Sequence, residues 1–287
     1  MRWERGRRSD NIEDRRGMRV TGKGAAGAGI GTILLALVAM YFGVDPSIVL
    51  NQAGNLGGAQ QQETAGPVAS SPEEERLKDF MSAVMGDTED VWGAIFKQSG
   101  QAYQQPKLVL FSGAVQSACG HAQSAMGPFY CPGDQKLYLD MSFFNDLAKR
   151  HDAPGDFAQA YVIAHEVGHH IQNLLGVAEQ VHAARSRADE AEGNALQVRM
   201  ELQADCYAGV WAHHAQRQRQ ILEPGDTEEA LAAAAGVGDD RLQKQARGYV
   251  VPESFTHGSS EQRMRWFNQG MQSGNPSQCD TFKAARL

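Results

Sequence analysis

The sequence predicts an α+β fold that is mostly helical, with a small β-sheet ahead of a helix that holds a histidine-rich motif, and one N-terminal transmembrane helix. Three observations predict it. Helix-forming residues dominate from Phe143 almost to the end of the 287 residues, β-prone runs separated by turn residues precede them, and an uncharged apolar run lies between Lys23 and Asp45. The apolar fraction of 42% fits a globular core and excludes a disordered protein.

The N-terminal 24 residues are basic, whereas the rest of the chain is acidic. They carry eight basic and four acidic side chains, a local charge of +4, which leaves −11 for the remainder. Positive residues beside an apolar run stay on the cytoplasmic side of a membrane, so residues 1–24 are predicted to form a basic cytoplasmic tail. The −11 of the remainder disfavours nucleic acid as a partner.

The apolar run, residues 24–44, has the length of a membrane span. Its 21 residues match the roughly 20 that a helix needs to cross a bilayer core of about 30 Å. A buried core helix would show a polar face, and a cleavable signal peptide would be shorter and end in a small-x-small site. We therefore predict a single anchor over 25–44 in the cell inner membrane, with the rest of the chain on the extracytoplasmic side.

Beyond the anchor, residues 45–75 are polar and rich in Gly, Gln and Ser, which is typical of a flexible linker. The folded domain then covers 76–287. Ser71 and Pro72, followed by three glutamates, predict a helix start, because serine caps and the helix dipole favours acids in the first turn. From Lys107 the runs KLVLFSGAV and FYCPGDQKLYLD predict the small sheet, and 136–140 is its expected substrate-binding edge.

The central motif is YVIAHEVGHHIQ, which contains HExxH as His165, Glu166 and His169. Four helical residues turn through about 400°, so the two histidines lie on one face and can bind one zinc ion. Glu166 lies about 100° around the helix, within reach of a water at that ion. The apolar residues before the motif indicate a buried helix, and buried polar groups without a cation would be costly. His170 points to another face and is predicted to be structural.

A catalytic zinc ion needs a third protein ligand, and the later run MELQADCYAGVWA offers two acids one helical turn apart. Glu201 is the predicted third ligand, and Asp205 is predicted to accept the outer N–H of a ligand histidine. A pair of surface acids is the alternative, which the apolar flanking residues disfavour.

HEVGHH followed by ELQAD resembles the gluzincin metallopeptidases, whose pattern is HExxH followed on a second helix by ExxxD. Together with VVPESFTHGSSEQRMRWF, the order of segments resembles the bacterial family of neutral zinc metallopeptidases over most of the chain. The resemblance implies a zincin-like domain, zinc held by His165, His169 and Glu201, and Glu166 as catalytic glutamate. The 31 residues between His169 and Glu201 must then form a helical excursion that returns the second helix to the metal.

The resemblance also implies a donor across the cleft that stabilises the charged intermediate. His257, in SFTHGSSEQR, is the candidate, and Tyr249 is a weaker one. The alternative is that His257 caps the following helix while Arg263 pairs with an acid.

Four cysteines lie after the predicted anchor, and an even number on the exported side suggests two disulfides. Cys119 and Cys131 flank a short turn-rich segment and are the first predicted pair, which leaves Cys206 with Cys279. Buried free thiols remain the alternative.

The expected activity is hydrolysis of peptide bonds in a peptide or protein substrate, with zinc and Glu166 activating water. The alternative is an inactive, zinc-stabilised interaction module tethered to the membrane. A chain that binds zinc but cleaves no peptide would favour that module. The sequence indicates no oligomeric state.

Overall fold

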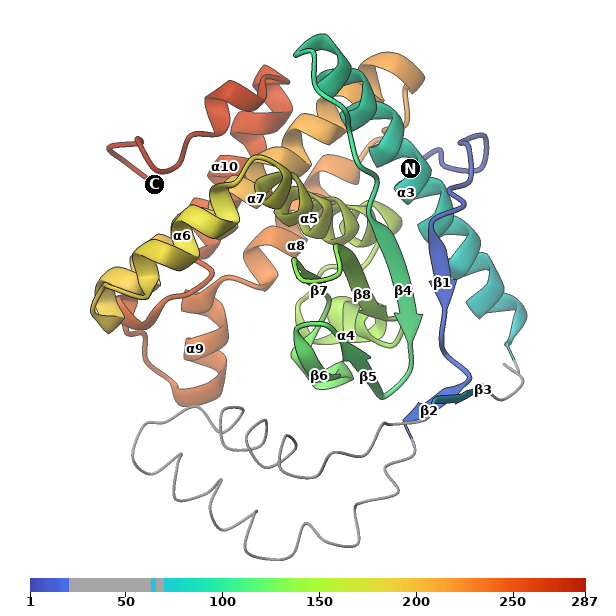
Figure 1. Ribbon diagram of the computed structural model, residues 1–287, viewed down its shortest axis with the longest axis horizontal. Coiled ribbons are helices and arrows are strands. Elements are labelled where there is room, and N and C mark those ends of the chain that lie inside the picture. Colours follow the sequence, from blue (N-terminus) through green and yellow to red (C-terminus); the bar gives the residue numbers. More distant parts are fainter. Residues whose placement is uncertain (21–62, 66–69) are drawn as a thin grey trace, which may run out of the picture.

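The computed structural model describes residues 1–20, 63–65 and 70–287, and it is mostly helical with small sheets, as predicted (Figure 1). In the described part of the chain, seven helices follow the sheet. The helices in chain order are α3 Pro72–Gln98, α4 Phe143–Arg150, α5 Asp156–Leu174, α6 Val177–Arg185, α7 Glu190–Arg219, α8 Asp226–Gly236, α9 Asp239–Arg247 and α10 Ser260–Ser273, with short 3₁₀ turns at Ser124–Met126, Pro252–Ser254 and Pro276–Cys279.

The main sheet has four strands in the order β1-β4-β8-β7. β1 runs parallel to β4, β4 parallel to β8, and β7 antiparallel to β8. β4 and β8 are nearly continuous apolar runs buried from their second residue on, as suits strands covered on both faces. The strands are β1 Ile12–Asp14, β4 Lys107–Phe111, β7 Phe129–Cys131 and β8 Lys136–Asp140, and the two small antiparallel pairs are β2 Met18–Val20 with β3 Glu63–Ala65 and β5 Ala114–Ser117 with β6 Gly120–Gln123.

Helix α3 begins where the sequence predicted. The Ser71 side chain accepts from the backbone N–H of Glu74, and the Glu74 carboxylate accepts from the backbone N–H of Ser71, which completes a capping box. Phe80, Met81, Val84 and Met85 on one face of this helix are all buried.

Two close helix contacts set the positions of the functional side chains. A Cβ at Gly168 of α5 would lie 2.8 Å from the Ala204 carbonyl oxygen of α7, so only glycine allows these backbones to approach as they do. A Cβ at Gly270 of α10 would lie 1.9 Å from the Cys206 carbonyl oxygen. α7 is therefore held between α5 and α10 with little room on either side.

The predicted membrane topology is wrong. β1 pairs with β4 inside the main sheet, and the Met1 ammonium lies 2.7 Å from the Asp156 carboxylate at the start of α5. Residues 1–20 and the domain therefore lie on the same side of any membrane, whereas a single span between them would separate the two. Arg7 and Arg8, predicted as cytoplasmic charge, pair instead with Glu89 and Asp79 of α3.

The predicted anchor itself, 25–44, lies outside the described residues, as does most of the predicted linker 45–75. In the part of the chain that the structure describes, no helix combines the length and the apolar character needed to cross a membrane. The transmembrane helix in the predicted fold class and the single-pass inner-membrane localisation are therefore not supported.

The structure contains both predicted disulfides. Cys119–Cys131 ties the β5–β6 hairpin to β7, and Cys206–Cys279 ties α7 to the C-terminal segment across 73 residues. Cys206 is fully buried inside α7, where a free thiol was the alternative.

Candidate metal centre

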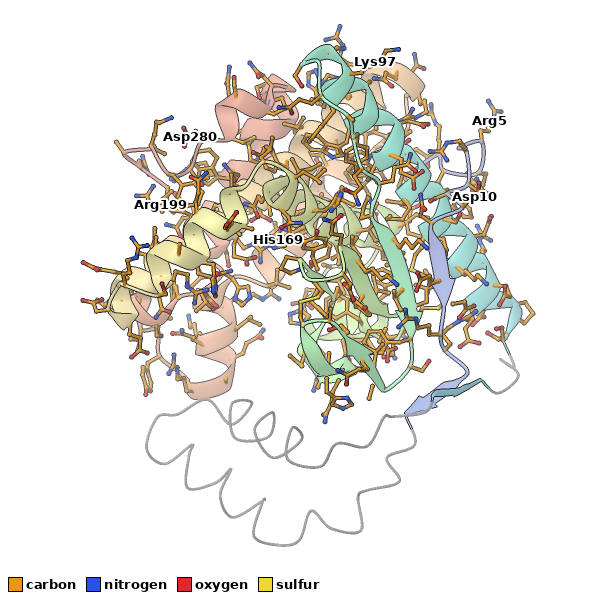
Figure 2. The ribbon with its side chains drawn as sticks, viewed as in Figure 1. Arg5, Asp10, Lys97, His169, Arg199 and Asp280 are labelled. Carbon is orange, nitrogen blue, oxygen red and sulfur yellow. A yellow bond between two sulfur atoms is a disulfide. The ribbon has the colours of Figure 1, made fainter. Side chains whose placement is uncertain are left out.

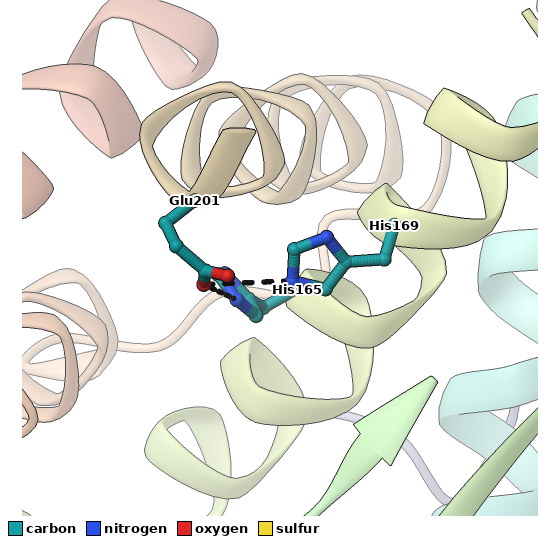
Figure 3. Close-up of side chains that lie close together, drawn as sticks. All are labelled: His165, His169 and Glu201. Carbon is teal, nitrogen blue, oxygen red and sulfur yellow. Dashed lines mark hydrogen bonds and ion pairs between the residues drawn. The ribbon is translucent and has the colours of Figure 1, made fainter. Parts of the chain in front are cut away.

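Three predicted ligands converge between α5 and α7. His165 and His169 extend from one face of α5, and Glu201 reaches them from α7 (Figure 3). The Glu201 Oε2 lies 3.2 Å from His165 Nε2 and 3.5 Å from His169 Nε2. Between His169 and Glu201 the chain completes α5, forms α6 and begins α7. Helix α7 then brings Glu201 back beside α5.

The donor set and spacing fit a zinc ion. Zinc binds nitrogen and oxygen ligands tetrahedrally at about 2.0–2.2 Å, so two ligand atoms of one ion lie about 3.4 Å apart. The two measured separations, 3.2 and 3.5 Å, bracket that value, and one ligand atom from each of the three residues lies within 4.8 Å of the others. Three protein ligands leave a fourth position for water or substrate, as in catalytic zinc sites.

The His165 ring is oriented by Asp205, in the position that the sequence assigned to it. His165 Nδ1 lies 2.8 Å from Asp205 Oδ1, so with its proton on Nδ1 the ring donates to Asp205 and directs its Nε2 lone pair to the metal position. Asp205 also accepts from Tyr161 at 2.5 Å and from both Nε and Nη2 of Arg263, at 2.8 and 2.9 Å. All four side chains are buried, and each of their charges has a partner.

His169 and Glu201 are held by two glutamines. His169 Nδ1 lies 2.8 Å from Gln172 Oε1, and Gln172 in turn donates to the Met200 carbonyl of α7. The second Glu201 oxygen, Oε1, accepts from Gln197 Nε2 at 2.9 Å. All three predicted ligands therefore have an outer hydrogen bond that fixes their orientation.

The electrostatics of the site favour a bound cation. Burial opposes charge on every member, but Arg263 and His165 still lower the pKa of Asp205 to about 2. Burial alone would lower the pKa of His165, whereas Asp205 and Glu201 raise it to about 9. Burial likewise opposes the change at Glu201, whose pKa is held well below its usual range by His169 and His165. The raised pKa of His165 shows that the two carboxylates attract positive charge: a proton supplies it when no metal is bound, and a zinc ion at this position would replace that proton.

The site opens into a cleft of about 1230 Å³ that Glu166 lines together with the three ligands. Glu166 is only 8% exposed, so this acid lies largely out of bulk solvent at the wall of the cleft. Apolar side chains of Phe129, Phe143 and Val162 line the same space. In Figure 2, His169 lies near the centre of the view, whereas Arg5, Lys97 and Asp280 lie at the edges of the molecule.

His257 lines the cleft, whereas Tyr249 does not. His257 is half exposed and its Nδ1 lies 3.3 Å from Asp239 Oδ1. The other Asp239 oxygen accepts the backbone N–H groups of Thr256, His257 and Gly258, which fixes this loop. The Tyr249 ring lies against Arg247 at the surface instead.

His170 is structural, as predicted. It is fully buried, with Nδ1 at 3.0 Å from the Tyr130 hydroxyl and Nε2 at 2.6 Å from the Gln104 carbonyl.

Sequence reasoning did not assign Gln172, Gln197, Tyr161 or Asp239 to the site. It named Arg263 only in the alternative for the His257 segment, as the partner of an unspecified acid, and that acid is Asp205. One signal pointed to Arg263, because a buried acid such as Asp205 requires donors. The glutamines are common helix residues, and nothing in their spacing marks them as partners of a metal ligand.

The chain is similar to two sets of curated proteins from bacteria. It is 50% identical over 297 residues to "Uncharacterized protein YpfJ" of Escherichia coli strain K12, an alignment that covers 98% of this chain and 99% of the relative. It is 44% identical over 268 residues to "Uncharacterized protein Rv2575" of Mycobacterium tuberculosis strain H37Rv, covering 87% and 86%. No solved structure matches the chain. Because the family pattern matches residues 1–282, the chain belongs to the family described as "Putative neutral zinc metallopeptidase".

Proposed function

We propose that this chain is a zinc-dependent endopeptidase that hydrolyses peptide bonds in peptide or protein substrates. The observation that carries the proposal is the convergence of His165, His169 and Glu201 at zinc-ligand spacing on the wall of a cleft, with Glu166 beside them. Membership of a family of zinc peptidases supports the same reaction class.

Each residue has a distinct role in this proposal. His165, His169 and Glu201 would hold zinc, which when bound polarises a carbonyl group and lowers the pKa of water towards about 7. Glu166 accepts a proton from the attacking water and delivers it to the leaving amine. Asp205 and Gln172 accept the Nδ1–H of His165 and His169, so that Nε2 of each ring is the nitrogen directed at the metal position.

His257 is the proposed donor to the oxygen that becomes negatively charged. Its hydrogen bond to Asp239 is the main cause of its raised pKa, against the effect of burial. With Nδ1 directed at Asp239, Nε2 is the nitrogen left to donate towards the cleft.

The free edge of β7 is the proposed binding strand for an extended substrate. β7 is the last strand of the sheet, and Phe129 and Tyr130 on it line the cleft. The segment first expected to bind substrate, Lys136–Asp140, forms β8, which is paired with β4 on one side and β7 on the other. Its backbone groups are therefore already used.

Glu166→Gln tests the proposal. The variant keeps the shape of the side chain but cannot accept a proton, so peptide cleavage is expected to fall by at least about a thousandfold. Zinc content, measured by mass spectrometry of the metal, is expected to stay at the parent level because Glu166 is not a proposed ligand. Unchanged cleavage by the variant would refute the role of Glu166, and zinc without cleavage in the parent would indicate a non-catalytic zinc protein.

A further inference from the structure

One wall of the cleft is a helical hairpin, formed by α6 and the first part of α7. It lies within the 31 residues between His169 and Glu201, after the last turn of α5, and α6 lies to the left of the main sheet in Figure 1. Val181, His182 and Arg185 of α6 and Gln197 of α7 face the cleft.

Arg185 differs from the other arginines that line this cleft. Its Nη1 donates to Gln197 Oε1 at 2.7 Å, and among the described residues no carboxylate lies within ion-pair distance of it. Arg263 is buried against Asp205, and Arg150 has Asp146 at 3.7 Å on its own helix. Glu179 also lines the cleft from α6, but six residues of helix place it about 9 Å away along the axis. Arg185 thus presents an exposed positive charge without a partner acid.

Arg185 is also close to the metal centre. Gln197 accepts from Arg185 through Oε1 and donates through Nε2 to Glu201 Oε1 at 2.9 Å. One amide group and two hydrogen bonds therefore separate the guanidinium from a proposed metal ligand. That path corresponds to about two residues of an extended peptide. A peptide bond at the metal would place a substrate group near Arg185.

We infer that Arg185 determines specificity by binding a carboxylate of the substrate, either an acidic side chain near the cleaved bond or, in a substrate that is cleaved close to its end, the C-terminal carboxylate. The inference rests on the proposed function, because it requires that peptides bind in this cleft. The planar guanidinium matches a carboxylate through two parallel hydrogen bonds, and the bond to Gln197 holds it in place.

Peptide binding tests this inference separately from cleavage. The zinc-loaded Glu166→Gln chain would be titrated with fluorescein-labelled octapeptides. Each peptide is neutral and contains Gln, except that a single Glu replaces one residue at a different position in each peptide. Every peptide is made with a free and with an amidated C-terminus. The expected result is a preference of about tenfold for a peptide with the added carboxylate. Preference for Glu identifies a side chain as the ligand, and preference for the free C-terminus identifies the terminal carboxylate.

Substitutions of Arg185 in this background provide the decisive comparison. Arg185→Gln is expected to abolish the preference, Arg185→Lys to retain part of it, and the control Arg150→Gln to leave it unchanged. Equal zinc content and unfolding temperature in the variants exclude a merely structural effect. Equal binding of all peptides, or a preference that survives Arg185→Gln, would overturn the inference. Peptides bound with an Arg185-dependent preference but not cleaved by the parent chain would contradict the proposed function alone.

Discussion

Two networks of charged side chains organise this molecule, and they differ in their exposure to water. In the network around the metal centre, the Asp205 side chain is 0% exposed and that of Arg263 is 4% exposed. In the network that holds residues 1–16 on α3, the pair of Arg8 and Asp79 is 33% and 48% exposed, although Glu89 and Arg16 of the same network are buried. The distances are similar, 2.8 Å and 2.6 Å, so geometry alone would rate the two pairs as equals.

The two pairs should differ in energy because water is excluded from one and surrounds the other. Removing one partner of a buried pair strands a charge away from water and costs about 3–5 kcal/mol, whereas an exposed pair contributes about 0–1 kcal/mol. Loss of one partner in the pair of Asp205 and Arg263 should therefore cost much more than loss of one partner in the pair of Arg8 and Asp79, and the N-terminal segment relies also on the buried side chains of Met1 and Trp3.

The largest effect is expected for Arg263→Met. The substitution leaves the Asp205 carboxylate buried with donors only from Tyr161 and His165, and the free energy of unfolding should fall by about 3–5 kcal/mol. Urea denaturation of the zinc-free and zinc-loaded proteins would measure it.

The control removes the stranded charge. Adding Asp205→Leu to Arg263→Met should restore much of the stability while leaving zinc binding weakened, because His165 loses its orienting carboxylate. If Arg263→Met alone unfolds at the same urea concentration as the parent, water or a side-chain movement must already solvate the Asp205 carboxylate. The contrast between the two networks would then disappear.

The grouping of His165, His169 and Glu201 in the candidate metal centre could be predicted from the sequence because its spacings are local. His165 and His169 are four residues apart, as are Glu201 and Asp205, so each pair lies on one helix face whatever the tertiary structure. The convergence of the two faces depends on the approach of α5 to α7 at Gly168, which no periodicity reveals. Arg263 lies 58 residues from Asp205 and could not be assigned without the packing of α10 on α7.

The N-terminal network could not be predicted because composition does not identify partners. Arg7 and Arg8 fit the positive-inside pattern of a membrane protein, but they can equally form ion pairs with acids of α3, as the structure shows. β1 is only three residues long, and its pairing with β4 joins segments that lie 96 residues apart in the chain, as in Ile12 with Leu108. Such long-range pairing carries no local sequence pattern.

A medium effect is expected from acid on the N-terminal segment. Burial opposes the change, but Lys136 and Arg15 lower the pKa of Glu13 to about 2, and hydrogen bonds from Arg16 and Lys78 lower the pKa of Asp14. Because both values lie below the unfolded values of about 4, their contribution is complete above about pH 5 and is lost as the pH falls towards 2.

Hydrogen exchange, corrected for the intrinsic effect of pH, would follow this loss. The amides of Leu108 and Arg15, which join β4 to the N-terminal segment, should lose protection at a higher pH than the amides of α5. Lys136→Met should move that loss to higher pH still. Simultaneous loss of protection in both regions would show that the N-terminal segment unfolds only with the core.

The smallest effect is expected for the exposed pair of Arg8 and Asp79. Arg8 also lies over the Trp3 ring at 5.3 Å and donates to the Gly6 carbonyl at 2.7 Å, so Arg8→Gln alone would remove more than the ion pair. A double-mutant cycle with Asp79→Asn isolates the ion pair, and its coupling energy is expected to be about 0.2–1 kcal/mol and to shrink in high salt. A coupling energy above about 2 kcal/mol that does not fall in high salt would mean that Arg8 and Asp79 behave like the buried pair of Asp205 and Arg263, because only charges removed from water interact so strongly. The N-terminal segment would then have to be counted as part of the core that supports the metal centre.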